Sequence, residues 1–162
     1  MNIIGIDKTL VNRVAPLVAD FRVVLRSYKG IHSEPNIEAA KAEILDFLKL
    51  GYPIFAAERD GRLAGYIVCK IQDDLLWVEH IYVSVEYRRK GVASLLFEKA
   101  EEISRSMGEE TVFNTVHPNN DGMIDFLRSK GYTVLNLIEI RKPYAGEKLS
   151  TTIRVNDRSF DY

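Results

Sequence analysis

The stretch from residue 53 to residue 85 constrains the fold more than any other part of the sequence, because it has the pattern of successive strands joined by tight turns. "PIFAAER" runs into Asp60-Gly61, a dipeptide typical of two-residue hairpin turns, and "RLAGYIVCKIQ" returns from it. Asp73-Asp74 then turns the chain into "LLWVEHIYVSV" (75–85). Hairpins join antiparallel strands. The pattern therefore excludes a doubly wound parallel sheet and predicts an α/β fold whose sheet is largely antiparallel.

Elsewhere the apolar side chains recur at helical or strand spacing. Helices are predicted at residues 10–25, 37–51, 91–107 and 120–130, and further strands at residues 2–6, 110–116, 132–142 and 148–155. Asp7 is the expected N-cap of the first helix, and Gly51 the expected end of the second. The predicted order is β-α-α-β-β-β-α-β-α-β-β, a mixed, largely antiparallel twisted sheet flanked by helices.

Composition limits the class of protein. At 162 residues we expect one domain spanning residues 1–162. Lys and Arg number 22 against 23 Asp and Glu, so a general nucleic-acid binder is not expected. The single cysteine, Cys69, excludes an internal disulfide and is typical of a reducing compartment. With no long apolar run and no signal-peptide pattern, we expect a cytoplasmic protein that does not contact the membrane.

A cluster of positive charge precedes the predicted helix at 91–107. Arg88, Arg89 and Lys90 stand directly before Gly91, although a helix start favours acidic or hydroxyl side chains. Successive backbone N–H groups at such a junction form an anion site, and glycine lets the backbone approach a ligand closely. A phosphate-bearing ligand is therefore expected, with a solvated charged turn as the alternative. A nucleotide-binding loop of the Walker type is disfavoured, because Val92-Ala93 follows the glycine.

These residues resemble the signature of the GNAT superfamily of N-acetyltransferases, which reads Gln/Arg-x-x-Gly-x-Gly/Ala and stands here as "RRKGVA" (88–93). The preceding "VEHIYV" (78–83) and the later "NNDGMIDFLRSKGY" (119–132) are also similar to family motifs, and the predicted element order agrees along nearly the whole chain. The family's usual proline two positions after Val83 is absent, since Val85 stands there.

The resemblance implies acetyl-CoA as cosubstrate, no metal, and a primary amine as acceptor. In the family the main chain of the strand binds the pantetheine arm as an added strand would, and the glycine turn binds the pyrophosphate. The implied cofactor-binding residues are Ile81, Tyr82, Val83, Arg88, Arg89, Lys90, Gly91, Val92, Ala93, Ser94 and Asn120. For Asn120 a plain helix cap is the alternative.

Glu79 is the expected catalytic residue. Amine acetylation requires a neutral amine, and a carboxylate beside the thioester can take its proton. Glu79 interrupts an otherwise apolar strand and matches a glutamate that diamine acetyltransferases and many relatives carry. A solvent-facing or ion-paired carboxylate is the alternative. His80 is the second candidate base, but strand alternation directs it to the opposite face.

One position departs from the family pattern. The tyrosine that usually protonates the leaving thiolate lies seven residues after the motif asparagine, and counting from Asn120 reaches Leu127. Tyr82, Tyr132 or a water are the alternatives for that proton. Because of Leu127, a catalytically silent CoA-binding module of the same fold is the alternative to an enzyme.

The sequence leaves the acceptor open between a small-molecule amine and a peptide amine. A homodimer is expected only by analogy with the family.

Overall fold

The computed structural model describes every residue from Met1 to Tyr162, and the chain forms two compact units, Met1–Phe126 and Leu127–Tyr162. The helices are α1 (Val11–Ser27), α2 (Ile37–Lys49), α3 (Val92–Ser106) and α4 (Asp121–Ser129). The strands are β1 (Asn2–Gly5), β2 (Ile54–Arg59), β3 (Arg62–Gln72), β4 (Leu75–Val83), β5 (Phe113–Asn114), β6 (Thr152–Val155) and β7 (Arg158–Asp161). Short 3₁₀ turns at Lys8–Leu10 and Val85–Tyr87 complete the list.

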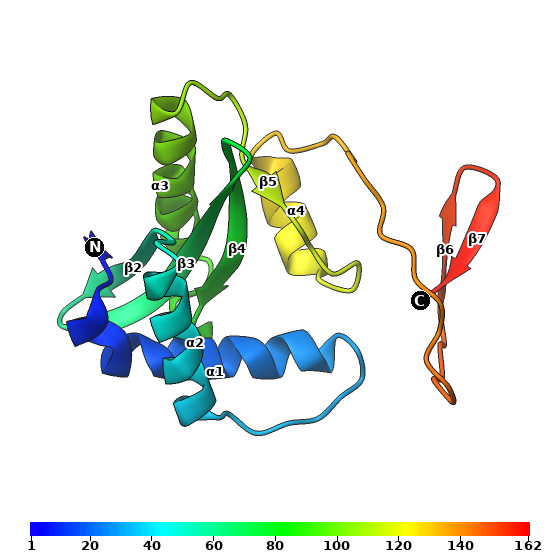
Figure 1. Ribbon diagram of the computed structural model, residues 1–162, viewed down its shortest axis with the longest axis horizontal. Helices are drawn as coiled ribbons and strands as arrows, with labels where there is room; N and C mark the ends of the chain where they lie inside the picture. The colour runs from blue at the N-terminus through cyan, green and yellow to red at the C-terminus, as the bar shows by residue number, and fades with distance from the viewer. The chain divides into compact units, whose positions relative to one another are not determined.

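The first unit is built on a five-stranded sheet in the order β1-β2-β3-β4-β5 (Figure 1). Strands β1 to β4 pair antiparallel, each with its neighbour, and β5 joins β4 in parallel. The prediction of a mixed and largely antiparallel sheet is confirmed. The order of helices and strands agrees with the prediction from β1 to α4.

Both hairpin turns form where Asp60-Gly61 and Asp73-Asp74 predict them. Asp60 and Gly61 have φ angles of 50° and 75°, and Asp73 and Asp74 have φ angles of 53° and 60°. Two consecutive residues with positive φ define a turn whose twist matches that of the adjoining strands, and Asp and Gly tolerate this conformation best. The turns therefore fix the pairing of β2 with β3 and of β3 with β4.

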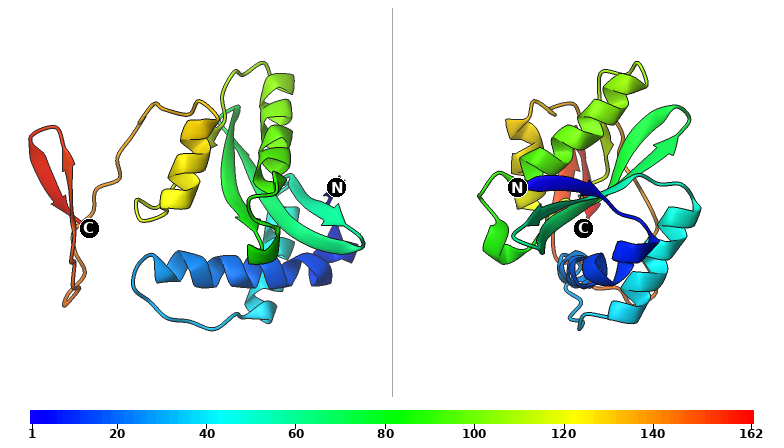
Figure 2. Two further views of the ribbon diagram at one scale, coloured as in Figure 1. Left: turned by 180° about the vertical axis from the view of Figure 1, so that it is seen from behind. Right: turned by 90° about the vertical axis from the view of Figure 1, so that its left-hand side faces the viewer.

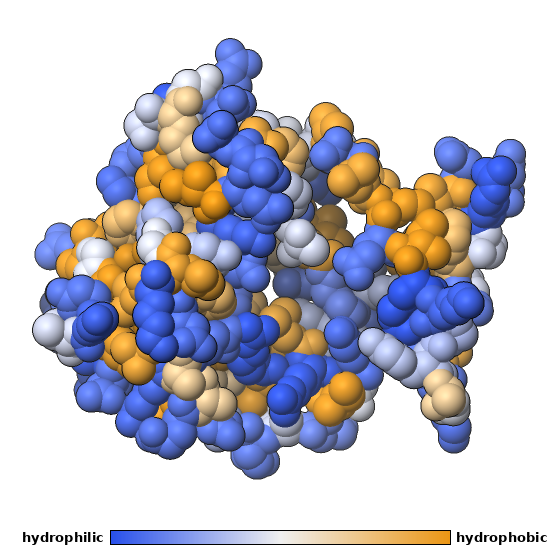
Figure 3. Space-filling view, in the orientation of Figure 1, coloured by the Kyte–Doolittle hydropathy of each residue, from blue (hydrophilic) through white to orange (hydrophobic).

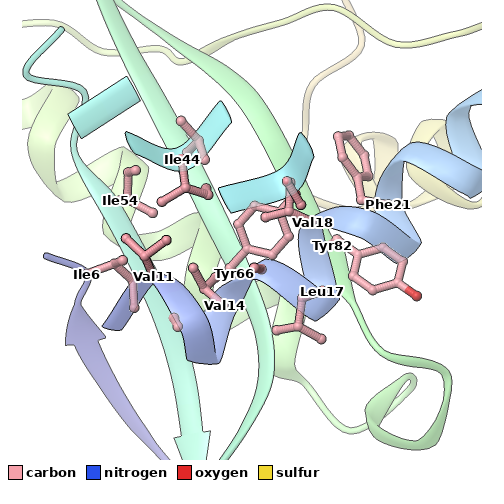
Figure 4. Close-up of a cluster of buried hydrophobic side chains, with 14 of the residues drawn as sticks. Ile6, Val11, Val14, Leu17, Val18, Phe21, Ile44, Ile54, Tyr66 and Tyr82 are labelled. Atoms are coloured by element: carbon pink, nitrogen blue, oxygen red, sulfur yellow. The ribbon is translucent and has the colours of Figure 1, made fainter. Parts of the chain in front are cut away.

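Helices cover both faces of this sheet. Helices α1 and α2 pack on one face, and α3 packs on the other (Figure 2). Figure 4 shows the core under α1 and α2, where Tyr66 from β3 lies among aliphatic side chains such as Val14, Val18 and Ile44. These four side chains are fully buried. Burying an aliphatic or aromatic side chain of this size contributes about 1.5–3 kcal/mol, which is what holds the helices to the sheet.

The predicted cap of the first helix is wrong by a few residues. Asp7 caps the 3₁₀ turn, where its carboxylate accepts a 2.8 Å hydrogen bond from the Thr9 backbone N–H. Helix α1 follows directly, with Leu10 in the cap position. The second helix ends as predicted: Leu50 is its C-cap, and Gly51 has a φ of 75°, a left-handed conformation that suits glycine.

The second unit contains the main error in the predicted strands. No strand forms at 132–142, and the predicted strand at 148–155 is reduced to β6, which pairs with β7 around a turn at Asn156. Alternation identifies residues that suit a strand, but a strand also needs a neighbouring strand for its backbone groups, and no strand pairs with residues 133–144. Val134, Leu135 and Leu137 are 87%, 77% and 78% exposed. The apolar surface of this segment is visible in Figure 3.

None of the helices combines the length and the hydropathy that crossing a membrane requires.

Candidate functional site

A groove of about 710 Å³ opens in the first unit. Its walls come from the C-terminal half of α1, from β4, from the start of α3, and from residues 114–126, which include the start of α4. The lining is mixed: apolar side chains such as Val24, Leu25 and Met123 stand beside Glu79, Arg88 and Arg89. A groove of this size and composition suits a long ligand that has both apolar and anionic parts.

The groove begins where β4 and β5 separate. The two parallel strands pair only at Trp77 with Phe113 and at Val78 with Asn114. Beyond that point both segments line the groove, β4 with Glu79, Ile81 and Val83, and the other side with residues 114–116. A strand that has lost its neighbour presents unpaired backbone groups along its edge. An extended ligand with amide groups can therefore hydrogen-bond along β4 as an added strand.

The start of α3 forms the other end of the groove. Gly91 occupies the N-cap position with a φ of 79°, and no side chain bonds the first backbone N–H groups. The first bond inside the helix runs from the Leu95 N–H to the Gly91 carbonyl at 3.1 Å. The N–H groups of Val92, Ala93 and Ser94 therefore have no acceptor within the helix, and all three residues line the groove. A Cβ at position 91 would meet nothing within 4 Å, so the space before the helix is open.

The three basic side chains before the helix form no ion pair with a carboxylate of the protein. Arg88 donates to the Val83 carbonyl at 3.0 Å, which attaches the turn to the end of β4. Lys90 donates to the Glu86 carbonyl at 2.9 Å and does not line the groove. Arg89 lines the groove and has no hydrogen-bond partner. Positive charge left unpaired beside free N–H groups fits a phosphate-bearing ligand.

Glu79 lies at a β-bulge where the groove begins. In the pairing with β3, Val78 faces Cys69 and His80 faces Val68, so Glu79 has no partner on β3. The extra residue changes the direction of side chains along β4. Val68 and Cys69 are consecutive residues of β3 and therefore point to opposite faces of the sheet. Their partners His80 and Val78 consequently also point to opposite faces, although they are two positions apart in β4. Glu79 is exposed, lines the groove and has no hydrogen bond or ion pair with the protein.

His80 is buried on the α1 and α2 face, with 3% of its surface exposed. Its ring centroid lies 4.6 Å from that of Phe21 and 5.2 Å from that of Phe47. Burial and the nearby Arg22 guanidinium lower the pKa of His80 to about 3. The imidazole is therefore neutral near pH 7, and it does not line the groove.

Asn120 joins the N-terminus of α4 to the C-terminus of α1. Its carboxamide oxygen accepts a 3.2 Å bond from the Met123 N–H, which makes it the cap of α4. The same oxygen accepts a 3.0 Å bond from the Tyr28 hydroxyl. The Asn119 side chain donates to the Tyr28 carbonyl at 2.9 Å, and the His117 ring stacks on the Tyr28 ring. The cap interpretation of Asn120 is confirmed, and the same residue lines the groove.

Tyrosines Tyr28 and Tyr82 both line the groove. Burial raises the pKa of Tyr28 and of Tyr82 above the ordinary value, so both phenols are protonated at neutral pH. Leu127 is buried within α4, and Tyr132 lies in the second unit. Burial also raises the pKa of the Cys69 thiol to about 12, in agreement with a packing role.

The structure brings the predicted site residues together with one exception. All of them line the groove except Lys90. Sequence patterns did not reveal Phe21, Val24 and Leu25, the α1 residues that form one wall. Helical periodicity assigns Phe21 and Leu25 to the buried stripe of the helix, and nothing local distinguishes a core residue from one that faces a groove. No cluster of His, Cys, Asp and Glu that could hold a metal ion is present.

Comparison with known proteins agrees with this geometry. The family model described as the acetyltransferase (GNAT) family matches residues 21–132. An uncharacterized N-acetyltransferase from Lactobacillus delbrueckii subsp. lactis is 29% identical over 82 residues, which are 46% of this chain and 47% of that protein. The chain thus spans about half the length of this curated relative.

Solved structures show the same fold. The structure of AAC(6')-Iy with the bisubstrate analog CoA-S-monomethyl-acetylneamine superposes with a TM-score of 0.71 at 17% identity, over 88% of this chain and 97% of that one. A ribosomal-protein-alanine N-acetyltransferase from Brucella melitensis biovar Abortus 2308 superposes with a TM-score of 0.68 at 16% identity, over 88% of this chain and 99% of that one.

Proposed function

Because the chain belongs to the GNAT family of acetyltransferases, we propose that it moves the acetyl group of acetyl-CoA to a primary amine. One observation carries the proposal. The groove between the separated strands leads from the unpaired carboxylate of Glu79 to the uncapped, cation-flanked N-terminus of α3. The site thus offers an acceptor for a proton and an anion site within one groove.

The residues of the groove fit the parts of acetyl-CoA. The N–H groups of Val92, Ala93 and Ser94 would hold the pyrophosphate, with Arg88 and Arg89 nearby and Lys90 at the rim of the turn. The main chain of Ile81, Tyr82 and Val83 would bind the pantetheine amides, and Asn120 would lie beside them. Acetyl-CoA supplies an activated thioester carbonyl, so no metal is needed.

Glu79 is the proposed general base. The amine must lose a proton as its nitrogen bonds to the acetyl carbon and the carbon–sulfur bond breaks. The carboxylate of Glu79 takes that proton, directly or through water. Glu79 forms no ion pair or hydrogen bond with the protein, so its carboxylate is free to contact the amine.

A tyrosine of the groove is the proposed donor for the departing thiolate, in place of the family tyrosine that Leu127 replaces. Tyr28 and Tyr82 both hold their protons at neutral pH. We favour Tyr28, because its hydroxyl lies at Asn120, the residue expected beside the pantetheine. To protonate the thiolate, the O–H turns from the Asn120 carboxamide oxygen to the sulfur, and the phenolate then regains its proton from water.

The acceptor is proposed as the amine of a small molecule or of a peptide. One similar structure holds a bisubstrate analog made from a neamine derivative, and another protein is a ribosomal-protein-alanine N-acetyltransferase, so the two span both classes. A cytoplasmic location and a homodimer remain predictions. The exposed apolar side chains of residues 134–140 support self-association, because apolar patches on a protein surface often mark interfaces.

The test is release of the CoA thiol from acetyl-CoA against a panel containing neamine, spermidine, a free amino acid and an alanyl peptide. Calorimetry in the same buffer measures CoA binding. Turnover of any member supports the enzyme. Binding without turnover of any amine favours the silent CoA-binding module, and absence of CoA binding overturns the proposal.

A further inference from the structure

The bulge that exposes Glu79 is not explained by the apolar pattern of β4. In "LLWVEHIYV" (75–83) apolar side chains occupy both faces, so shifting the strand by one residue would still bury apolar surface. The register of a strand is specified strongly only when one face differs from the other. The turn at Asp73-Asp74 fixes the pairing only as far as Cys69 with Val78, so another contact must place the extra residue of the bulge at Glu79.

His80 has the contacts to do so. Its Nδ1 lies 3.2 Å from the Tyr66 hydroxyl on β3, and its Nε2 lies 3.1 Å from a guanidinium nitrogen of Arg22 on α1. Arg22 is in turn paired with Glu43 on α2. The residue next to Glu79 is thus tied to a strand and to two helices on the far side of the sheet from α3.

The chemistry of the partners determines the tautomer. A guanidinium can only donate, so Nε2 of His80 is the acceptor and the proton of the neutral ring is on Nδ1. Nδ1–H then donates to the Tyr66 oxygen. Glu43 lies 3.4 Å from Nε2 but receives no proton from it, because His80 is neutral and Nε2 already accepts from Arg22.

Neighbouring registers lose these bonds. A slip of one residue in one direction would put Ile81 in the place of His80 and leave Tyr66 without its partner in a fully buried position. A slip in the other direction would put the Glu79 carboxylate beside Glu43. A buried polar group without a hydrogen-bond partner destabilises the fold, which favours the observed register over another of similar apolar burial.

We propose that His80 is a positioning residue, which holds the β4 bulge in place through Tyr66 and Arg22 and so keeps the Glu79 carboxylate in the groove. The proposal rests on the proposed function for its effect on catalysis. Its structural part, the anchoring of the bulge, does not depend on turnover.

The experiment compares His80→Leu with the wild type in kcat, in CoA affinity and in hydrogen exchange of the amides of residues 78–81. We expect kcat with the best amine of the panel to fall about 10- to 100-fold, since small displacements of catalytic groups cost this much. We expect the dissociation constant for CoA to stay unchanged, and exchange at the bulge to become faster.

Two further variants separate positioning from general destabilisation. In an E79Q background, His80→Leu should cause no additional loss of kcat, because the group that it positions is already gone. Ile44→Ala removes a fully buried side chain from the same face without touching this chain of bonds, and should lower stability while leaving kcat within about twofold. If His80→Leu fails to fold, Tyr66→Phe, which removes a single oxygen, replaces it in the experiment. We expect this variant to show a smaller fall in kcat and a smaller increase in exchange at the bulge, with unchanged CoA affinity.

Unchanged kcat and exchange in folded His80→Leu would overturn the proposal, as would a further loss of kcat in the E79Q background. A wild type without turnover would count against the proposed function, and the exchange measurement would still decide the anchoring.

Discussion

The Tyr28 hydroxyl donates a 3.0 Å hydrogen bond to the carboxamide oxygen of Asn120, although the two residues are 92 positions apart in the chain. This bond closes one wall of the groove, because it joins the end of α1 to the start of α4. It also places a protonated phenol at Asn120, the residue that we propose lies beside the pantetheine. The structure thus contains a tyrosine in the groove despite Leu127.

Tyr28→Phe removes the hydroxyl and keeps the ring that stacks on His117. We expect a loss of about 0.5–1.5 kcal/mol in the free energy of unfolding, measured with urea, for the lost hydrogen bond. If Tyr28 donates the proton to the thiolate, kcat falls about 100-fold or more, as for other general acids. Tyr82→Phe is the matched control, and a larger kcat loss in that variant would move the donor role to Tyr82.

Glu79→Gln keeps the size of the side chain and removes its basicity. We expect kcat to fall by about 10²- to 10⁴-fold while the calorimetric dissociation constant for CoA stays the same, because Glu79 is expected to act on the amine. Glu38→Gln, which removes an exposed carboxylate from α2, should change neither quantity. Full activity of Glu79→Gln would exclude Glu79 as the base.

Gly65→Ala tests the close approach of β3 to the end of β4. A Cβ at position 65 would lie 2.5 Å from the Tyr82 carbonyl oxygen and 3.1 Å from the Val83 Cα, so β4 must shift. We expect weaker CoA binding together with a lower melting temperature. Gly5→Ala on β1 meets nothing within 4 Å and should leave CoA binding intact. Equal behaviour of the two variants would contradict a role for the β3–β4 contact in binding.

Arg89→Gln removes a positive charge from the turn before α3. Arg89 lines the groove, and its guanidinium has no hydrogen-bond or ion-pair partner in the protein. We expect the CoA dissociation constant to rise about tenfold, with a weaker dependence on salt, since a charge-assisted contact to phosphate is lost. Arg59→Gln at the end of β2 should leave it unchanged. An Arg89→Gln protein that binds CoA like the wild type would place the phosphates elsewhere.

The buried neutral His80 predicts acid sensitivity. Its folded-state pKa, about 3, lies below the ordinary value of 6.5, so the unfolded chain binds the additional proton between these limits. The contribution of His80 to stability is therefore complete above pH 6.5 and declines as the pH falls towards 3, by about 1.4 kcal/mol per pH unit. Urea unfolding between pH 4.5 and 7 should show this slope in the wild type and in His32→Gln, but a shallower one in His80→Leu. Equal slopes in all three proteins would contradict a neutral His80.

The hairpins and the ends of most helices could be predicted from the sequence, because these features depend on local conformational preferences. Asp60-Gly61 and Asp73-Asp74 adopt the positive φ angles that their residue types favour, and Gly51 and Gly91 mark helix ends. The signature "RRKGVA" predicted the cation-flanked start of α3 for the same reason, since a helix N-terminus and its flanking charges are neighbours in the chain. Only the position of Lys90, which turns its amine to the Glu86 carbonyl, differs from that prediction.

Three features of the groove could not be predicted from local sequence and are set by tertiary packing. The α1 wall of the groove, the bond from Tyr28 to Asn120 and the register that exposes Glu79 all join residues distant in sequence. Residues 132–142 show that a local pattern is not sufficient for a strand, because their alternating apolar side chains suit a strand and yet no strand forms there. Periodicity indicates which side chains prefer burial. The pairing partner of a strand, its register and the shape of the groove depend on which distant segments pack against one another, and this follows from the packing of the whole fold.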